Sequence, residues 1–149
     1  MDPRAFFEPD VIAGNKLIVW NSDRLWHFGY MQSSIFMAWV RAFAGRLKSD
    51  FSVSPALVYF PIPFVVPNGA QEKRIDAAVQ AILDERERHG AHLDDLYAPT
   101  AMPLELRRRH YALDALIDDL YGLRRPTEAG RMKALLRSYE KVRSSNTKT

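Results

Sequence analysis

The residues best suited to contact an acidic ligand lie in the stretch FMAWVRAFAGRLKSD, residues 36–50. Read as a helix, this stretch places Arg41 and Lys48 on one polar face, and it places Arg46 at the edge of an apolar arc beside Trp39. Such head groups reach solvent, a carboxylate or a phosphate. The spacing therefore predicts either a phosphate-contacting surface or an ordinary solvated helix face.

The same helix must also be anchored in a core. Its apolar arc would be the buried stripe, and Ser33 or Ser34 would cap its first turn. The predicted stripe consists of Ile35, Phe36, Trp39, Val40, Phe43 and Leu47.

Other combinations of residues point more weakly to chemistry. His89 and His92, followed by Asp94 and Asp95, have a spacing that a metal could use, but a solvated helix end explains them fully. His27 is expected to be a core histidine with its hydrogen bonds satisfied.

Charged runs on the later helices have structural explanations. Glu105 precedes Arg108 and Arg109 by three and four residues, so ion pairing within the helix is favoured over phosphate contact for the run 107–109. Asp118 and Asp119 are expected to balance nearby arginines.

Motifs that would make the chain an enzyme are missing from the sequence. It contains no GxGxxG, no GxxxxGK[ST] and no NPPY-type tetrapeptide. No catalytic, cofactor-binding or metal-ligating residue is therefore predicted.

Composition limits the classes of protein to which the chain can belong. With 149 residues and 47% hydrophobic residues, the chain suits one ordinary domain or two small packed units. A formal charge of +3 permits nucleic-acid binding without demanding it. The absence of cysteine and of a long apolar run predicts a cytoplasmic protein without a membrane partner.

The breakers Pro67, Asn68 and Gly69 divide the chain. The first unit, residues 1–67, is expected to have short strands at 16–20 and 56–60 around a helical pair, in which Asp23 would cap the first helix.

The second unit, residues 68–143, is expected to be a three-helix bundle, followed by a disordered tail at 144–149. Its helices would begin near Ala70, Pro103 and Thr127, and the first two would stop at Gly90 and Gly122. The predicted fold class is mainly α, of the α+β type.

Ordered landmarks in both units resemble a known family. WHFGYMQSSIFMAWVRAFAGRLKSD, followed by LVYFPIP, is similar to the end of the target-recognition domain of MmeI-like Type II DNA methyltransferases, which are fused restriction-modification enzymes. LDDLYAPTAMPLELRRRHYALDALIDDLYG resembles the helical carboxy-terminal domain of the same family. The resemblance covers about residues 8 to 142.

The resemblance implies DNA as the partner, with Arg41, Arg46, Lys48, Ser33 and Ser34 as the nucleic-acid-binding residues. The chain departs from the family pattern at Ser52, at Ala98 and between Tyr59 and Phe60, where an Asn-x pair is absent.

The family's catalytic and S-adenosylmethionine-binding motifs lie upstream of the matched region. The resemblance therefore implies a non-catalytic recognition and scaffolding part of a DNA methyltransferase, of the adenine-N6 or a related type, with a catalytic subunit as a candidate partner. The alternative is a protein-interaction module or gene remnant that self-associates, and a homodimer is expected through the first unit.

Overall fold

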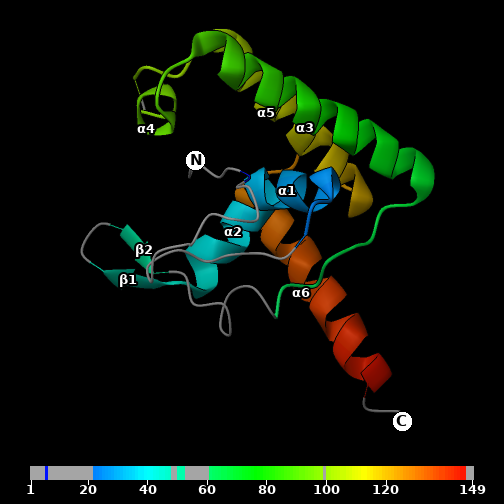
Figure 1. Ribbon diagram of the computed structural model, residues 1–149. Coiled ribbons are helices and arrows are strands. Elements are labelled where there is room, and N and C mark those ends of the chain that lie inside the picture. The colour runs from blue at the N-terminus through cyan, green and yellow to red at the C-terminus, as the bar shows by residue number, and fades with distance from the viewer. Residues whose placement is uncertain (1–5, 7–21, 48–49, 53–60, 99, 147–149) are drawn as a thin grey trace.

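The structure is a computed structural model and describes residues 6, 22–47, 50–52, 61–98 and 100–146 (Figure 1). It is mainly helical, as predicted. The elements in order are α1 (Leu25–Gln32), α2 (Ser34–Phe43), β1 (Gly45–Leu47), β2 (Asp50–Ser52), α3 (Gly69–His89), α4 (Leu93–Leu96), α5 (Leu104–Leu120) and α6 (Glu128–Asn146).

Local sequence signals set most of the helix ends. Asn68 and Gln71 form a capping box at the start of α3, and Gly90 ends that helix with a left-handed φ of 58°. Pro103 precedes α5 directly. The Thr127 hydroxyl accepts a hydrogen bond from the Gly130 amide at 3.2 Å in the first turn of α6. The predicted boundaries near these residues are confirmed.

The helices form stacked layers (Figure 1). α3 and α5 lie side by side, α1 packs against both, and α2 packs against α1, α5 and α6. α1 approaches α3 closely at Gly29, where an added Cβ would lie 2.7 Å from Cγ2 of Val79. A side chain at this position would therefore push the two helices apart.

One continuous core joins the two halves of the sequence. Residues from the amino-terminal and carboxy-terminal helices belong to the same buried cluster, so neither half encloses a core by itself in the described part of the chain. The predicted division at residues 67–68 stays a prediction. The largest fully buried side chains of the cluster are those of Tyr30, Phe36, Ile35, Ile75, Ile82, Leu106, Leu113, Ile117 and Leu135.

One expectation for the first unit is corrected, and another falls outside the described residues. α2 ends at Phe43, and the backbone then enters the antiparallel pair β1–β2, with Gly45 opposite Ser52 and Leu47 opposite Asp50. Glycine has a low helix propensity, so helical spacing alone did not carry the helix past Gly45. The strands expected at 16–20 and 56–60 lie outside the described residues and have no support from the structure.

The expected three-helix bundle is also corrected. α3 and α5 pair as predicted, but α6 packs mainly against α2. On α6, Leu135 is fully buried, whereas Leu136, Tyr139 and Val142 are exposed. α6 also continues through Ser144 to Asn146, where a disordered tail was expected. Within the described residues, no helix combines the length and apolarity needed to cross a membrane.

Candidate nucleic-acid interface

The amino terminus of α2 is fixed by both predicted serines. Ser33 is the N-cap: its hydroxyl accepts from the Phe36 amide at 3.3 Å and donates to the Tyr30 carbonyl at 2.6 Å. Ser34 donates from its amide and its hydroxyl to the two carboxylate oxygens of Asp114, each at 2.6 Å. Both hydroxyls are therefore engaged within the protein and hold α2 in place.

Asp114 belongs to α5, eighty residues away in sequence. A carboxylate at a helix amino terminus is stabilised by the helix dipole and by the free amides there. Burial raises the pKa of Asp114, while the hydrogen bonds from Ser34 oppose that rise. Sequence reasoning missed this contact because nothing near Ser34 in the sequence points to α5.

The inner face of α2 is an aromatic anchor. Trp39 is only 3% exposed, and its ring lies 4.3 Å from the Phe43 ring and 6.3 Å from the Tyr139 ring of α6. The predicted buried arc is confirmed for Ile35, Phe36, Trp39 and Val40, but Phe43 is 44% exposed at the end of the helix.

Arg41 lies on the outer face of α2, as predicted, and is exposed. Its Nη1 atom is 2.8 Å from Oε2 of Glu128, the first residue of α6. An exposed ion pair of this kind contributes about 0.2–1 kcal/mol, so a phosphate could replace the carboxylate at little cost. The acid was missed because it lies 87 residues away in sequence.

The other two predicted cations follow the end of α2. Arg46 lies in β1, where its backbone is paired in register with Phe51. Lys48 falls outside the described residues. The prediction that Arg41 and Lys48 share one face of a helix is wrong, because α2 ends five residues before position 48.

α5 also holds α6 in place. Asp118 is buried and accepts two hydrogen bonds from Arg131 of α6, at 2.9 and 2.7 Å. This bidentate pair confirms the balancing role predicted for Asp118. Glu105 lies 3.0 Å from Arg109 and 3.7 Å from Arg108, which confirms the predicted ion pairing within α5.

A buried polar cluster joins four helices. Arg86 of α3 donates to the Tyr97 hydroxyl at 2.7 Å and to Oε1 of Gln32 at 3.2 Å. The same hydroxyl lies 2.7 Å from Nε2 of His110, and the Arg86 guanidinium also lies over the rings of Phe28 and Tyr97.

The cluster keeps His110 neutral. Burial, together with the positive charge of Arg86, lowers the pKa of His110 to about 4. Because the Tyr97 hydroxyl accepts from Arg86, its own proton can be donated to Nε2 of His110. The arrangement is a structural network in which Nδ1 of His110 and Nε2 of Gln32 are buried without a hydrogen-bond partner.

His27 is half-buried and hydrogen-bonded, close to the core role predicted for it. Its Nδ1 atom lies 2.8 Å from the Ser22 hydroxyl. Burial, with a smaller contribution from Arg24, lowers its pKa.

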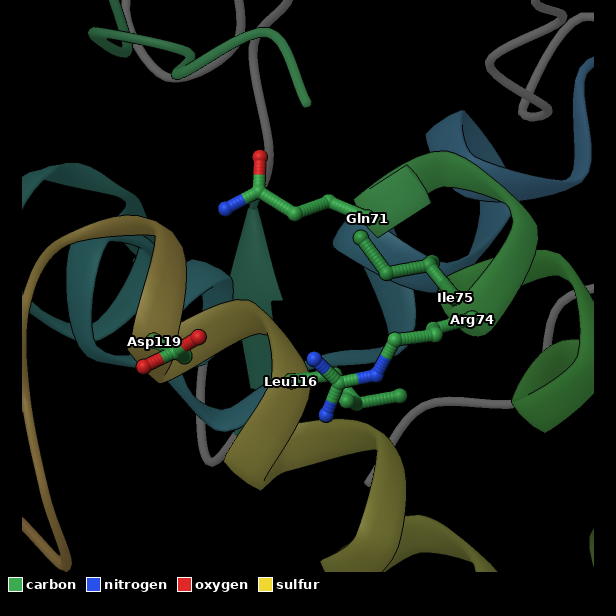
Figure 2. A pocket seen from close by; sticks show the side chains of 5 residues that line it. All are labelled: Gln71, Arg74, Ile75, Leu116 and Asp119. Carbon is green, nitrogen blue, oxygen red and sulfur yellow. The ribbon is translucent and has the colours of Figure 1, made fainter. Parts of the chain in front are cut away.

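The pocket in Figure 2 lies between α3 and α5 and is lined by Gln71, Arg74, Ile75, Leu116 and Asp119. Its volume is about 10 Å³, roughly that of one water molecule, whereas cofactor pockets measure hundreds of Å³. In the described part of the chain, no three His, Cys, Asp or Glu residues gather as metal ligands would. His89 instead lies 3.2 Å from Glu85.

The sequence and the fold match one class of protein. Residues 2–67 match a family described as "MmeI, target recognition domain", and residues 66–146 match one described as "MmeI, C-terminal domain". The chain belongs to the MmeI family, and the two matches together cover residues 2–146.

Two relatives agree with this assignment. The chain is 34% identical over 143 residues to DNA methyltransferase A of Bacillus subtilis (strain 168), covering 94% of this chain and 16% of that protein. It is 37% identical, with a TM-score of 0.78, to the Type IIL restriction-modification enzyme MmeI solved in complex with DNA, over 83% of this chain and 17% of that one. The chain thus spans about a sixth of the length of each relative.

Proposed function

We propose that this chain binds duplex DNA through the outer face of α2 and the β1–β2 pair, and that it acts as the recognition and scaffolding part of an adenine-N6-type restriction-modification methyltransferase. Arg41, Arg46 and Lys48 are the proposed contacts to phosphates or bases. Ser33 and Ser34 act indirectly, because their hydroxyls hold the helix that carries these cations.

The observation that carries the proposal is the construction of α2. Its inner face is buried on Trp39, its amino terminus is locked to Asp114, and its outer face presents an exposed arginine directly before a strand pair. A rigid helix of this kind can hold positive groups at a fixed place on a duplex, which is how backbone contacts set the register of base reading.

Selection from a pool of randomised duplexes tests the proposal. The unsubstituted chain should enrich a sequence motif, and Arg46→Ala with Lys48→Ala should lose it while keeping the same unfolding midpoint. Arg107→Ala with Arg108→Ala, on α5, is the matched control and should retain the motif. A chain that binds no duplex at low salt would overturn the proposal.

We also propose that this chain does not bind S-adenosylmethionine. A methyltransferase subunit or segment outside the matched region would bind the cofactor and transfer its methyl group. Support comes from the absence of a glycine-rich loop and of a base-binding tetrapeptide in the sequence. The isolated chain should incorporate no radiolabelled methyl group into DNA, compared with a heat-inactivated control. Incorporation above that control would contradict this assignment.

One observation favours self-association as a second role. Leu136, Tyr139 and Val142 expose apolar surface on one side of α6, and Phe43 at the end of α2 is also exposed. We propose a two-fold dimer that buries this side of α6. The interface expected through the first unit, near residues 17–20 and 57–60, lies outside the described residues and stays a prediction. Light scattering over a range of concentrations should show dimers that Tyr139→Ser with Val142→Ser separates. A monomer at all concentrations would contradict it.

A further inference from the structure

Positive charge is distributed very unevenly along this chain. Residues 122–149 contain eight Lys and Arg against two Glu, whereas residues 1–121 contain thirteen Lys and Arg against sixteen Asp and Glu. The first segment therefore carries a net charge of +6 and the second a net charge of −3, so the whole excess belongs to α6 and its flanks.

The two acidic residues of this segment are Glu128 and Glu140. Glu128 is directed at Arg41 of α2, and Glu140 is the one acidic residue of α6 beyond its first turn. Among the cations, Arg131 is turned inward to Asp118. The other Lys and Arg side chains of α6, those of Lys133, Arg137, Lys141 and Arg143, are exposed.

Three of these cations form a row. Lys133, Arg137 and Lys141 follow one another at i, i+4 and i+8, and all three are exposed. That spacing places them within about 80° of arc and along about 12 Å of helix. A row this straight presents several cations to one extended anion.

The loop before α6 adds two more cations. Arg124 and Arg125 are exposed, and Arg125 has a φ of 47°. In the described part of the chain it is the one non-glycine residue with a positive φ.

We infer that the outer face of α6, with Arg124 and Arg125, is a second DNA-contacting surface that binds the phosphate backbone without reading sequence. This inference rests on the proposed DNA binding and extends it to the C-terminal domain. A duplex is the chosen partner because its regular negative charge complements a straight row of cations.

An anionic membrane is the competing partner, since α6 also exposes apolar side chains. Those side chains continue the stripe that packs on α2, where the Tyr139 ring lies 6.3 Å from that of Trp39. An interfacial helix needs a broad free apolar face. On α6 part of that face is covered, so the duplex is favoured.

The test compares two triple variants of the full chain that lose the same charge. Arg125→Gln, Lys133→Gln and Arg137→Gln remove cations from the α6 surface, and Lys73→Gln, Arg74→Gln and Arg108→Gln remove exposed cations from α3 and α5. Anisotropy titrations with a labelled 30-base-pair duplex, at several concentrations of KCl, give Kd and its salt slope.

For the α6 variant, the salt slope should fall by about two to three units and binding at low salt should weaken roughly tenfold or more, equally for two unrelated duplexes. The control variant should match the unsubstituted chain. Two results would contradict DNA binding by the α6 surface without contradicting the proposed function. Either both variants weaken DNA binding equally, or the α6 variant binds DNA as well as the unsubstituted chain does.

Three further outcomes are informative. A chain that binds no duplex overturns the proposed function and this inference together. If the Arg46 and Lys48 variant keeps its selected motif while the α6 variant loses affinity, the proposed contacts of the first surface are wrong and the second surface stands. Co-sedimentation with anionic vesicles that is lost in the α6 variant, without any duplex binding, would assign the surface to a membrane.

Discussion

Positive charge has opposite roles in two regions of the molecule. One region is the layer formed by α1, α3 and α5, and the other is the helix α6. In the layer, Arg86 is buried, hydrogen-bonded to Tyr97 and Gln32 and covered by aromatic rings. On α6, Lys133 and Arg137 are exposed. Because one region uses its cation for packing and the other leaves its cations in solvent, stability and binding should respond to different substitutions.

The largest expected effect is on stability, at the contact between the two regions. Trp39→Ala removes a 3% exposed indole and should lower the free energy of unfolding by roughly 3–5 kcal/mol, measured by urea denaturation. Tyr139→Ala on α6 removes a ring that is 39% exposed and should cost clearly less. Equal losses would mean that α6 is as much a part of the core as α2 is.

Acid should destabilise the layer next. The pKa of His110 is about 4 when folded and about 6.5 when unfolded, so the unfolded chain binds the proton more readily. The stability that His110 contributes is complete above pH 6.5, decreases as the pH falls towards 4, and amounts to roughly 3 kcal/mol at most.

Urea denaturation at pH 7 and at pH 5 measures this loss, and His110→Gln is the control because glutamine does not titrate. The variant should show a much smaller difference between the two pH values. A His110→Gln chain with the full pH dependence would place the titrating group elsewhere, with His27, whose pKa is also lowered, as the first candidate.

A pair of glycine substitutions separates the two regions further. At Gly29 in the layer, an added Cβ lies 2.7 Å from Val79, so Gly29→Ala should cost about 1–2 kcal/mol after the gain in helix propensity. At Gly130 in α6, the nearest atoms lie at 3.5 Å, so Gly130→Ala should be neutral or stabilising by up to about 1 kcal/mol. Thermal unfolding of both variants compares them, and a stabilising Gly29→Ala would show that α1 and α3 can separate.

The smallest expected effect is at Arg41 and Glu128. A double-mutant cycle with alanine at both positions should give a coupling energy of about 0.2–1 kcal/mol that decreases as salt is added. A coupling of several kcal/mol would indicate that Arg41 is a structural residue held in place by α6.

Sequence reasoning succeeded wherever the determinant was local. Asn68, Gly90, Pro103 and Thr127 act on the backbone within a few residues, so the helix ends near them were predictable. The buried arc from Ile35 to Val40 was predictable for the same reason, because helical periodicity is a property of neighbouring residues.

It failed where the determinant was distant. An apolar stripe on α6 shows that the helix packs, and only the fold shows that it packs on α2. The partners of Ser34 and Arg41 lie 80 and 87 residues away, and no spacing rule reaches that far. The sequence could therefore predict that Arg41 lies on an exposed helix face, but it could not predict the contacts that fix the position of that helix.

The cluster around Arg86 has a consequence for how the chain folds. Gln32, Arg86, Tyr97 and His110 come from α1, α3, the end of α4 and α5, so the complete set of their hydrogen bonds forms only when all four segments have assembled. A partly assembled chain would bury some of these groups unpaired, at about 1–3 kcal/mol for each. Intermediates with two or three of these helices docked are thereby disfavoured, and we expect this region to fold and unfold in a single cooperative step.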